Sequence, residues 1–171
     1  LWFCHRDTIL VKGEHEPEYF AATDNEPAKI VFAHGFFVSA LHEISHWCMA
    51  GQKRRLLNDF GYWYAPDGRN EEQQQQFEQV EILPQAIECL LTLACNKPFS
   101  VSKDNLFADF DTSQSTFEAD VHAQAVKFWQ TGQKLSTDAK VLLSQLTKLR
   151  PLPLTSFDIS HNFIKVNFYQ S

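Results

Sequence analysis

The spacing of apolar residues changes near residue 34, and this change limits the chain to a small sheet followed by helices. The runs DTILVKG (7–13) and AKIVFA (28–33) are rich in β-branched residues and lie between turn-forming residues, which is typical of strands. From Phe37 onwards apolar residues recur at helical spacing, and Gly51 is placed to end that helix. We therefore expect an α+β fold, with a small mixed sheet packed against several helices.

The remaining segments are interpreted by the same rules. The acidic, Pro-containing segment 14–27 predicts a surface loop, and the aromatic run from Phe60 to Tyr64 is strand-like. Pro84 marks either the first turn of a new helix or a kink. Periodicity predicts helices within 71–96, at 116–132 and at 136–149, and a last strand from Phe163 to Tyr169.

Size and charge narrow the class of protein. With 171 residues, the chain fits one domain spanning 1–171, and no apolar run approaches the roughly 18 to 20 residues needed to cross a bilayer. We expect a cytoplasmic protein with no membrane partner. The net charge of −6 argues against direct nucleic-acid binding and suits a cationic or protein substrate.

The chain has four cysteines, Cys4, Cys48, Cys89 and Cys95, and no two of them form a C-x-x-C pair. This spacing favours reduced thiols over a disulfide framework or a zinc site.

The stretch ALHEISHWCMAG (40–51) carries two histidines four residues apart. On a helix, such residues are offset by only about 40°, so His42 and His46 can reach one metal ion. Glu43 completes the H-E-x-x-H pattern of zinc hydrolases, in which the glutamate is the general base. The alternative is a surface helix with ordinary histidines. The apolar opposite face and the preceding strand favour a metal site, with Glu43 as a catalytic residue.

A third protein ligand is needed, and spacing leaves its identity open. Glu78 and Glu81 lie three apart on the next helix, and the apolar neighbours of Glu81 favour an inward position for it. His122 is a rival ligand, although a hydrogen-bonded core histidine is its more frequent fate. Two histidines and one carboxylate serve either a zinc hydrolase or a ferrous-iron oxygenase, and residue types alone do not choose between them.

Four segments together resemble the bacterial elongation factor P hydroxylases over most of residues 8–130: IVFAHGFFVSALHEISHWCMAG, DFGYWYAPDGRN, QFEQVEILPQA and VHAQ. The resemblance implies hydroxylation of elongation factor P on a lysine already extended by a β-lysyl group. It also implies metal ligation by His42, His46 and Glu81, and a fold like that of a metal-dependent endoribonuclease family. The tail from Phe157 to Ser171 departs from the family pattern.

The implied reaction favours iron over zinc. Oxidation of an unactivated C–H bond needs a redox-active metal, a role that zinc does not fill, so the expected cofactor is a divalent metal, Fe(II). Glu43 would then orient a histidine or move protons. A requirement for 2-oxoglutarate stays open, since Arg54 and Arg55 suit either such a dicarboxylate or the end of a helix. A zinc-dependent peptidase or endoribonuclease, and a binding module with a structural metal, are the competing functions.

An ammonium-bearing substrate also suits one aromatic segment. Asp59 and Asp67 bracket the run Tyr62-Trp63-Tyr64, where carboxylates and ring faces can both attract a cation. We therefore expect substrate binding by Asp59, Tyr62 and Asp67. Core packing of the rings, and a turn built by Asp67, are the structural alternatives.

Overall fold

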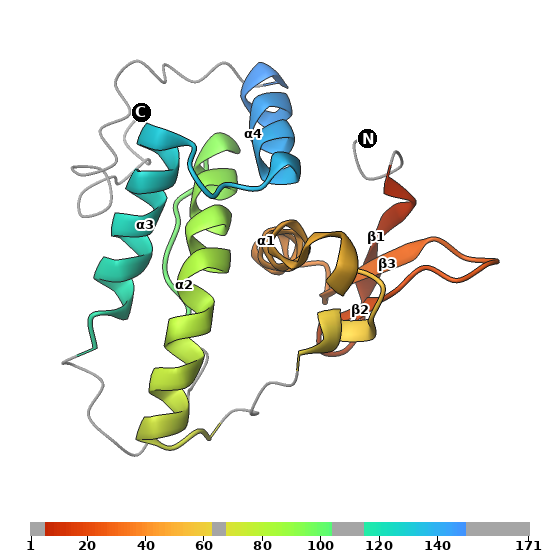
Figure 1. The fold of residues 1–171 in the computed structure, drawn as a ribbon, viewed down its shortest axis with the longest axis horizontal. Coiled ribbons are helices and arrows are strands. Elements are labelled where there is room, and N and C mark those ends of the chain that lie inside the picture. Colours follow the sequence, from red (N-terminus) through yellow and green to blue (C-terminus); the bar gives the residue numbers. More distant parts are fainter. Residues whose placement is uncertain (1–5, 63–67, 104–114, 150–171) are drawn as a thin grey trace.

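In the part of the chain that the structure describes, three strands are followed by four α-helices (Figure 1). The computed structural model describes residues 6–62, 68–103 and 115–149. The elements are β1 (Thr8–Gly13), β2 (Glu18–Phe20), β3 (Ala28–Ala33), α1 (Phe37–Arg54), the short 3-10 helix η2 (Asn58–Gly61), α2 (Glu71–Ala94), α3 (Phe117–Thr131) and α4 (Thr137–Leu149). The expected α+β class, with a small mixed sheet and several helices, is confirmed. The likeness to an endoribonuclease fold and the extent of the domain over 1–171 stay predictions.

The sheet has the order β1-β3-β2, with β3 parallel to β1 and antiparallel to β2. Alternation along the strands turns Tyr19 and Ile30, which are register partners, into the core. The strands at 7–13 and 28–33 were predicted from sequence, whereas assigning all of 14–27 to a loop was wrong. β2 is only three residues long, and its pairing with β3 supplies the backbone hydrogen bonds that its sequence does not signal.

Helix α1 lies between the sheet and α2, and Figure 1 shows it almost end-on. Its buried stripe includes Leu41, Ile44 and Cys48, as the spacing predicts. Phe37, expected to continue this stripe, is instead 47% exposed because it lies in the first turn of the helix, beyond the core. Gly51 interrupts the regular helix with a φ of 67°, a conformation that glycine adopts without steric cost.

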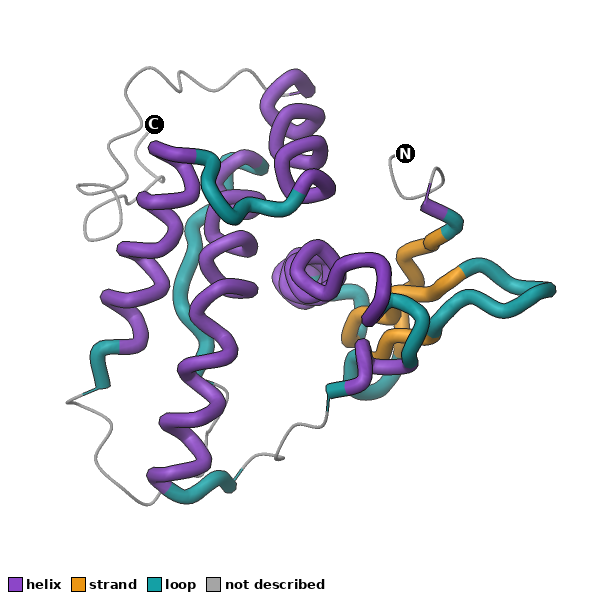
Figure 2. The backbone as a smooth tube through the Cα atoms, viewed as in Figure 1, coloured by secondary structure: helices purple, strands orange, loops and turns teal. Residues whose placement is uncertain are grey.

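Helix α2 is continuous through Pro84, so no new helix begins there. Its first turn is closed by a capping box, in which the Asn70 side chain accepts from the Gln73 backbone N–H and the Gln73 side chain accepts from that of Asn70. After α2 the chain runs back along the helix as an extended segment (Figure 2). The side-chain amide of Gln85 holds this segment by bonding both the N–H and the C=O of Ser102. Helix α3 can therefore run beside α2 in the same direction.

The aromatic run after α1 is not a strand where the structure describes it. Residues Asn58–Gly61 form the η2 turn, with Asp59 and Phe60 at positive φ values of 47° and 58°. Phe60 is buried and stacks on Tyr19, with ring centroids 4.1 Å apart. Packing against β2 thus outweighs the β propensity of this segment. The rest of the run, residues 63 and 64, and the strand expected at 163–169 lie outside the described residues.

Two expectations concern the chain as a whole. None of the described helices is both long and apolar enough to cross a bilayer. Cys48 and Cys89 are buried free thiols, in agreement with the sequence, Cys95 is half-buried, and Cys4 lies outside the described residues.

Candidate metal centre

Two helices bring together three side chains of types that can ligate a metal, where α1 crosses α2. His42 and His46 come from successive turns of α1, and Glu81 comes from α2. The ligand atoms of these three residues all lie within 4.8 Å of one another. The His46 Nε2 atom lies 3.1 Å from His42 Nε2 and 3.3 Å from the Glu81 Oε1 atom, while His42 Nε2 lies 3.8 Å from Glu81 Oε2. Among the residues that the structure describes, this is the one group of His, Cys, Asp and Glu with such convergence.

Burial increases across the cluster. The side chain of Glu81 is 2% exposed, that of His46 11% and that of His42 28%. The cluster therefore opens to solvent on the side of His42. The helical spacing of the histidines and the inward position of Glu81 agree with the sequence analysis.

The rival ligands lie elsewhere. Glu78 accepts hydrogen bonds from the Gln74 side-chain amide at 3.2 Å and from the Ser115 hydroxyl at 2.7 Å. His122, on α3, lies with its ring centroid 6.4 Å from that of Phe99 and is not part of the converging group. The crossing of the two helices brings Glu81 to the histidines and leaves Glu78 and His122 outside the group, whereas metal ligation by Glu81 stays a prediction.

Sequence reasoning missed two buried partners of the cluster. The Glu88 carboxylate accepts a hydrogen bond from His42 Nδ1 at 2.8 Å, and the Gln85 amide donates to Glu81 Oε2 at 3.3 Å. Glu88 and Gln85 are only 4% and 1% exposed. The spacing of Glu81, Gln85 and Glu88 places them on one face of α2. Their polar side chains interrupt an otherwise apolar stretch at helical spacing, and this pattern is the sequence signal that predicts buried polar residues there.

The cluster is electrostatically suited to a cation. Burial acts to lower the pKa of His42, but the hydrogen bond and negative charge of Glu88, with the charges of Glu81 and Glu43, outweigh it and raise the pKa to about 9. Burial acts to raise the pKa of the Glu81 carboxyl, yet both imidazoles and the Gln85 amide lower it below its usual range. Burial raises the pKa of the Glu43 carboxyl, which follows His42 on the helix. The two histidines act to lower this pKa, whereas the charges of Glu81 and Glu88 raise it further. Three carboxyl groups therefore surround two imidazoles.

These residues fit a divalent metal. Two imidazole nitrogens and one carboxylate oxygen are ligands that both zinc and ferrous iron accept, and they leave coordination positions free. The two Nε2 atoms are 3.1 Å apart and share a hydrogen bond, so a cation bound with Glu81 would take the place of the proton between them. Such a site can hold an ion and expose it to a substrate on the side of His42.

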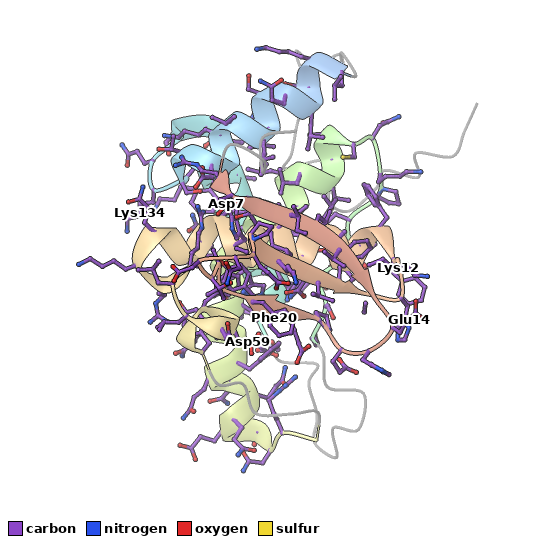
Figure 3. All side chains as sticks on the ribbon, turned by 90° about the vertical axis from the view of Figure 1, so that its right-hand side faces the viewer. Asp7, Lys12, Glu14, Phe20, Asp59 and Lys134 are labelled. Atoms are coloured by element: carbon purple, nitrogen blue, oxygen red, sulfur yellow. The ribbon has the colours of Figure 1, made fainter. Side chains whose placement is uncertain are left out.

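The residues expected to bind substrate or co-substrate have structural partners where they are described. Asp59 accepts from the Tyr19 backbone N–H at 2.9 Å, which anchors β2, and Figure 3 shows it beside that strand. Tyr62 is 42% exposed, and the Arg54 guanidinium lies over its ring, 3.9 Å from the centroid.

Arg55, considered for a dicarboxylate co-substrate, donates hydrogen bonds to the Trp47 carbonyl oxygen and to Asp138. Asp67 lies outside the described residues. Substrate contacts by Asp59, Tyr62 and Asp67 remain predictions.

Comparison with known proteins supports the family expected from the sequence. The model of a family described as elongation factor P hydroxylase matches residues 1–154. The chain is 43% identical over 157 residues to the elongation factor P lysine hydroxylase of Haemophilus influenzae, an alignment covering 90% of this chain and 88% of that protein. The family match ends before the tail at 157–171 that departs from the pattern. The chain belongs to the elongation factor P hydroxylase family.

Proposed function

We propose that this protein is a hydroxylase that acts on elongation factor P, at a lysine already extended by a β-lysyl group, with a metal held by His42, His46 and Glu81. The convergence of these three ligands within 4.8 Å, on the H-E-x-x-H helix of a chain in this family, carries the proposal. The relative from Haemophilus influenzae is named as a lysine hydroxylase of the same translation factor. A cytoplasmic location is proposed on the same ground.

Fe(II) is the metal that we propose for the site, because when bound it supplies the redox chemistry with dioxygen that C–H hydroxylation requires. His42 and His46 would hold the ion from one helix face, and Glu81 would neutralise part of its charge from the other helix. The Gln85 amide keeps the Glu81 carboxylate turned toward the histidines. Burial of Glu81 and His46 keeps water away from the inner side of the site.

Glu43 is the residue to which we assign proton movement. It follows His42 directly on α1, and its carboxyl is held in the same electrostatic neighbourhood as both histidines. A carboxyl next to a reacting centre can accept a proton and return it without itself ligating the ion. The zinc hydrolase pattern would assign the same side chain to a water molecule, so the reaction rather than the residue separates the two functions.

The positive charge of the proposed substrate side chain is complementary to the negative charge of the site. A β-lysyl-lysine side chain carries ammonium groups, and carboxyl groups of Glu43, Glu81 and Glu88 contribute negative potential around His42, where the site is open. The protein's net charge of −6 acts in the same direction. The overall field therefore attracts a cationic side chain toward the metal rather than a nucleic acid.

Intact mass spectrometry tests the proposal. β-Lysylated elongation factor P is incubated with the protein, ferrous iron, air and a reductant, and the product should gain the mass of one oxygen atom. His46→Ala should abolish this gain, because it removes a proposed ligand. His122→Ala is the matched control, since that histidine lies outside the converging group, and it should retain activity. Cleavage of a peptide or RNA with zinc, without any oxygen gain, would instead favour the metallohydrolase.

A further inference from the structure

A buried carboxylate outside the three proposed ligands contacts one of them. Glu88 lies two helical turns beyond Glu81 on the same face of α2, and its Oε2 atom is 2.8 Å from His42 Nδ1. Its side chain is 5% exposed, between the fully buried residues Ile87 and Cys89. A carboxylate in such surroundings is costly unless it is paired and hydrogen-bonded. The histidine ring is therefore the feature that makes this position favourable for a charge.

The contact also determines which ring nitrogen of His42 is available. With Nδ1–H donating to Glu88, the lone pair of the neutral ring is at Nε2. That Nε2 atom faces His46 Nε2 at 3.1 Å and lies on the Glu81 side of the ring. The hydrogen bond thus selects the tautomer that can ligate an ion in the cluster, and it limits rotation of the ring about its bond to the helix.

The proposed function assigns this residue no task, and the inference rests on that function's metal site. We propose that Glu88 is a positioning residue, which raises the metal affinity of the site by holding His42 as the Nδ1–H tautomer with Nε2 directed at the ion. Glu88 does not itself ligate, because its bonded oxygen contacts the ring nitrogen opposite to the cluster. Gln85 has the parallel task for Glu81, so a single face of α2 supplies one ligand and the supports of two.

The test replaces Glu88 with glutamine, which has the same shape but no charge. An amide can donate to Nδ1 and so favour the wrong tautomer, with the proton on Nε2. The dissociation constant for Zn(II) alone is measured on metal-free protein against a competing chelator, at a temperature where both proteins are folded. Glu88→Gln should bind zinc about 10- to 100-fold more weakly, the usual effect of losing such a support.

Two controls separate positioning from general damage. Leu91→Ala creates a cavity at a side chain of the same helix that is 1% exposed and carries no metal-ligating atom, so it should lower the midpoint of unfolding while leaving zinc affinity unchanged. In the zinc-loaded wild type, nitrogen-15 NMR should assign the proton of His42 to Nδ1 and the metal to Nε2. In Glu88→Gln this Nδ1–H signal should shift or be lost, a change that a purely structural role would not produce.

The possible results distinguish failure of the Glu88 role from failure of the proposed metal site. If wild-type protein binds zinc and Glu88→Gln binds it equally well with an unchanged His42 signal, the positioning role is overturned and the metal site stands. If wild-type protein and His46→Ala bind zinc equally weakly, the proposed metal site is overturned together with the role of Glu88. Weaker zinc binding by Glu88→Gln alone, with Leu91→Ala unaffected, establishes the inference.

Discussion

The end of the histidine helix is fastened to α4 by an ion pair that a single substitution can break. Arg55 lies directly after α1, and its Nη2 atom is 2.7 Å from Asp138 Oδ2, with both side chains 11% exposed. Its guanidinium also stacks on Trp47, 3.4 Å from the ring centroid, and donates twice to the Trp47 carbonyl oxygen. Asp138→Ala removes the carboxylate and leaves the guanidinium charge buried without it.

The expected cost follows from this geometry. Breaking a buried ion pair from one side costs about 3 to 5 kcal/mol. The lower end applies here, because Arg55 keeps its bonds to Trp47, and the second cation on Asp138, Arg6, has a side chain that is 32% exposed. A loss of about 3 kcal/mol in the free energy of unfolding lowers the melting temperature of a chain of this size by roughly 6 to 12 °C.

Urea and thermal unfolding of the metal-free protein, followed by circular dichroism, measure this loss. Asp120→Ala is the matched control, since Asp120 is also in the first turn of a helix but is exposed, and it should cost under about 1 kcal/mol. Arg55→Met in the Asp138→Ala background should recover part of the stability by removing the buried charge. A loss below about 1 kcal/mol for Asp138→Ala would refute the reasoning.

Three further outcomes are expected. Glu43→Gln should leave zinc bound and reduce hydroxylation at least tenfold, as measured by metal analysis and by product mass. Loss of the metal would instead identify Glu43 as a ligand and contradict the assignment of Glu81. The pKa of His42 in the metal-free protein is raised from 6.5 to about 9, so the stability it contributes is fully present below about pH 6.5 and is lost as pH rises through about 9. Urea unfolding in a chelator at both ends of this range would show a flat profile if the carboxylates did not act on that ring. Burial raises the pKa of Cys48 to about 12 and also raises that of Cys89, so iodoacetamide at pH 8 should alkylate both only after unfolding, as peptide mass mapping would report.

Local sequence patterns were sufficient for the helices and for the histidine pair. Helical spacing places His42 and His46 on one face whatever surrounds the helix, whereas Gly51, expected to end the helix, only interrupts it, and α1 continues to Arg54. The predicted helices at 116–132 and 136–149 correspond to α3 and α4 within one residue at each end. These features depend on contacts within a few residues, which a sequence displays directly.

The sequence was insufficient wherever a distant segment supplies the stabilising contact. β2 exists because β3 pairs with it and because the Asp59 side chain accepts from its backbone, and neither partner is visible in its own three residues. For the same reason sequence alone predicts a strand for the run beginning at Phe60, although packing on Tyr19 holds that residue in a turn.

The candidate site shows the same difference between features of a single helix and contacts between two helices. The sequence by itself determined that two imidazoles share a helix face and that acidic residues follow on the next helix, because both are properties of a single helical period. From the residues alone Glu78, Glu81 and His122 all stayed open as the third ligand, and the sequence predicted no role for Glu88. The tertiary structure decided which of them lie beside the histidines, since the crossing of α1 over α2 brings Glu81 and Glu88 there and leaves Glu78 with Ser115. The choice of partner depends on how two helices pack, and residues 35 to 46 positions apart in the chain meet only through that packing.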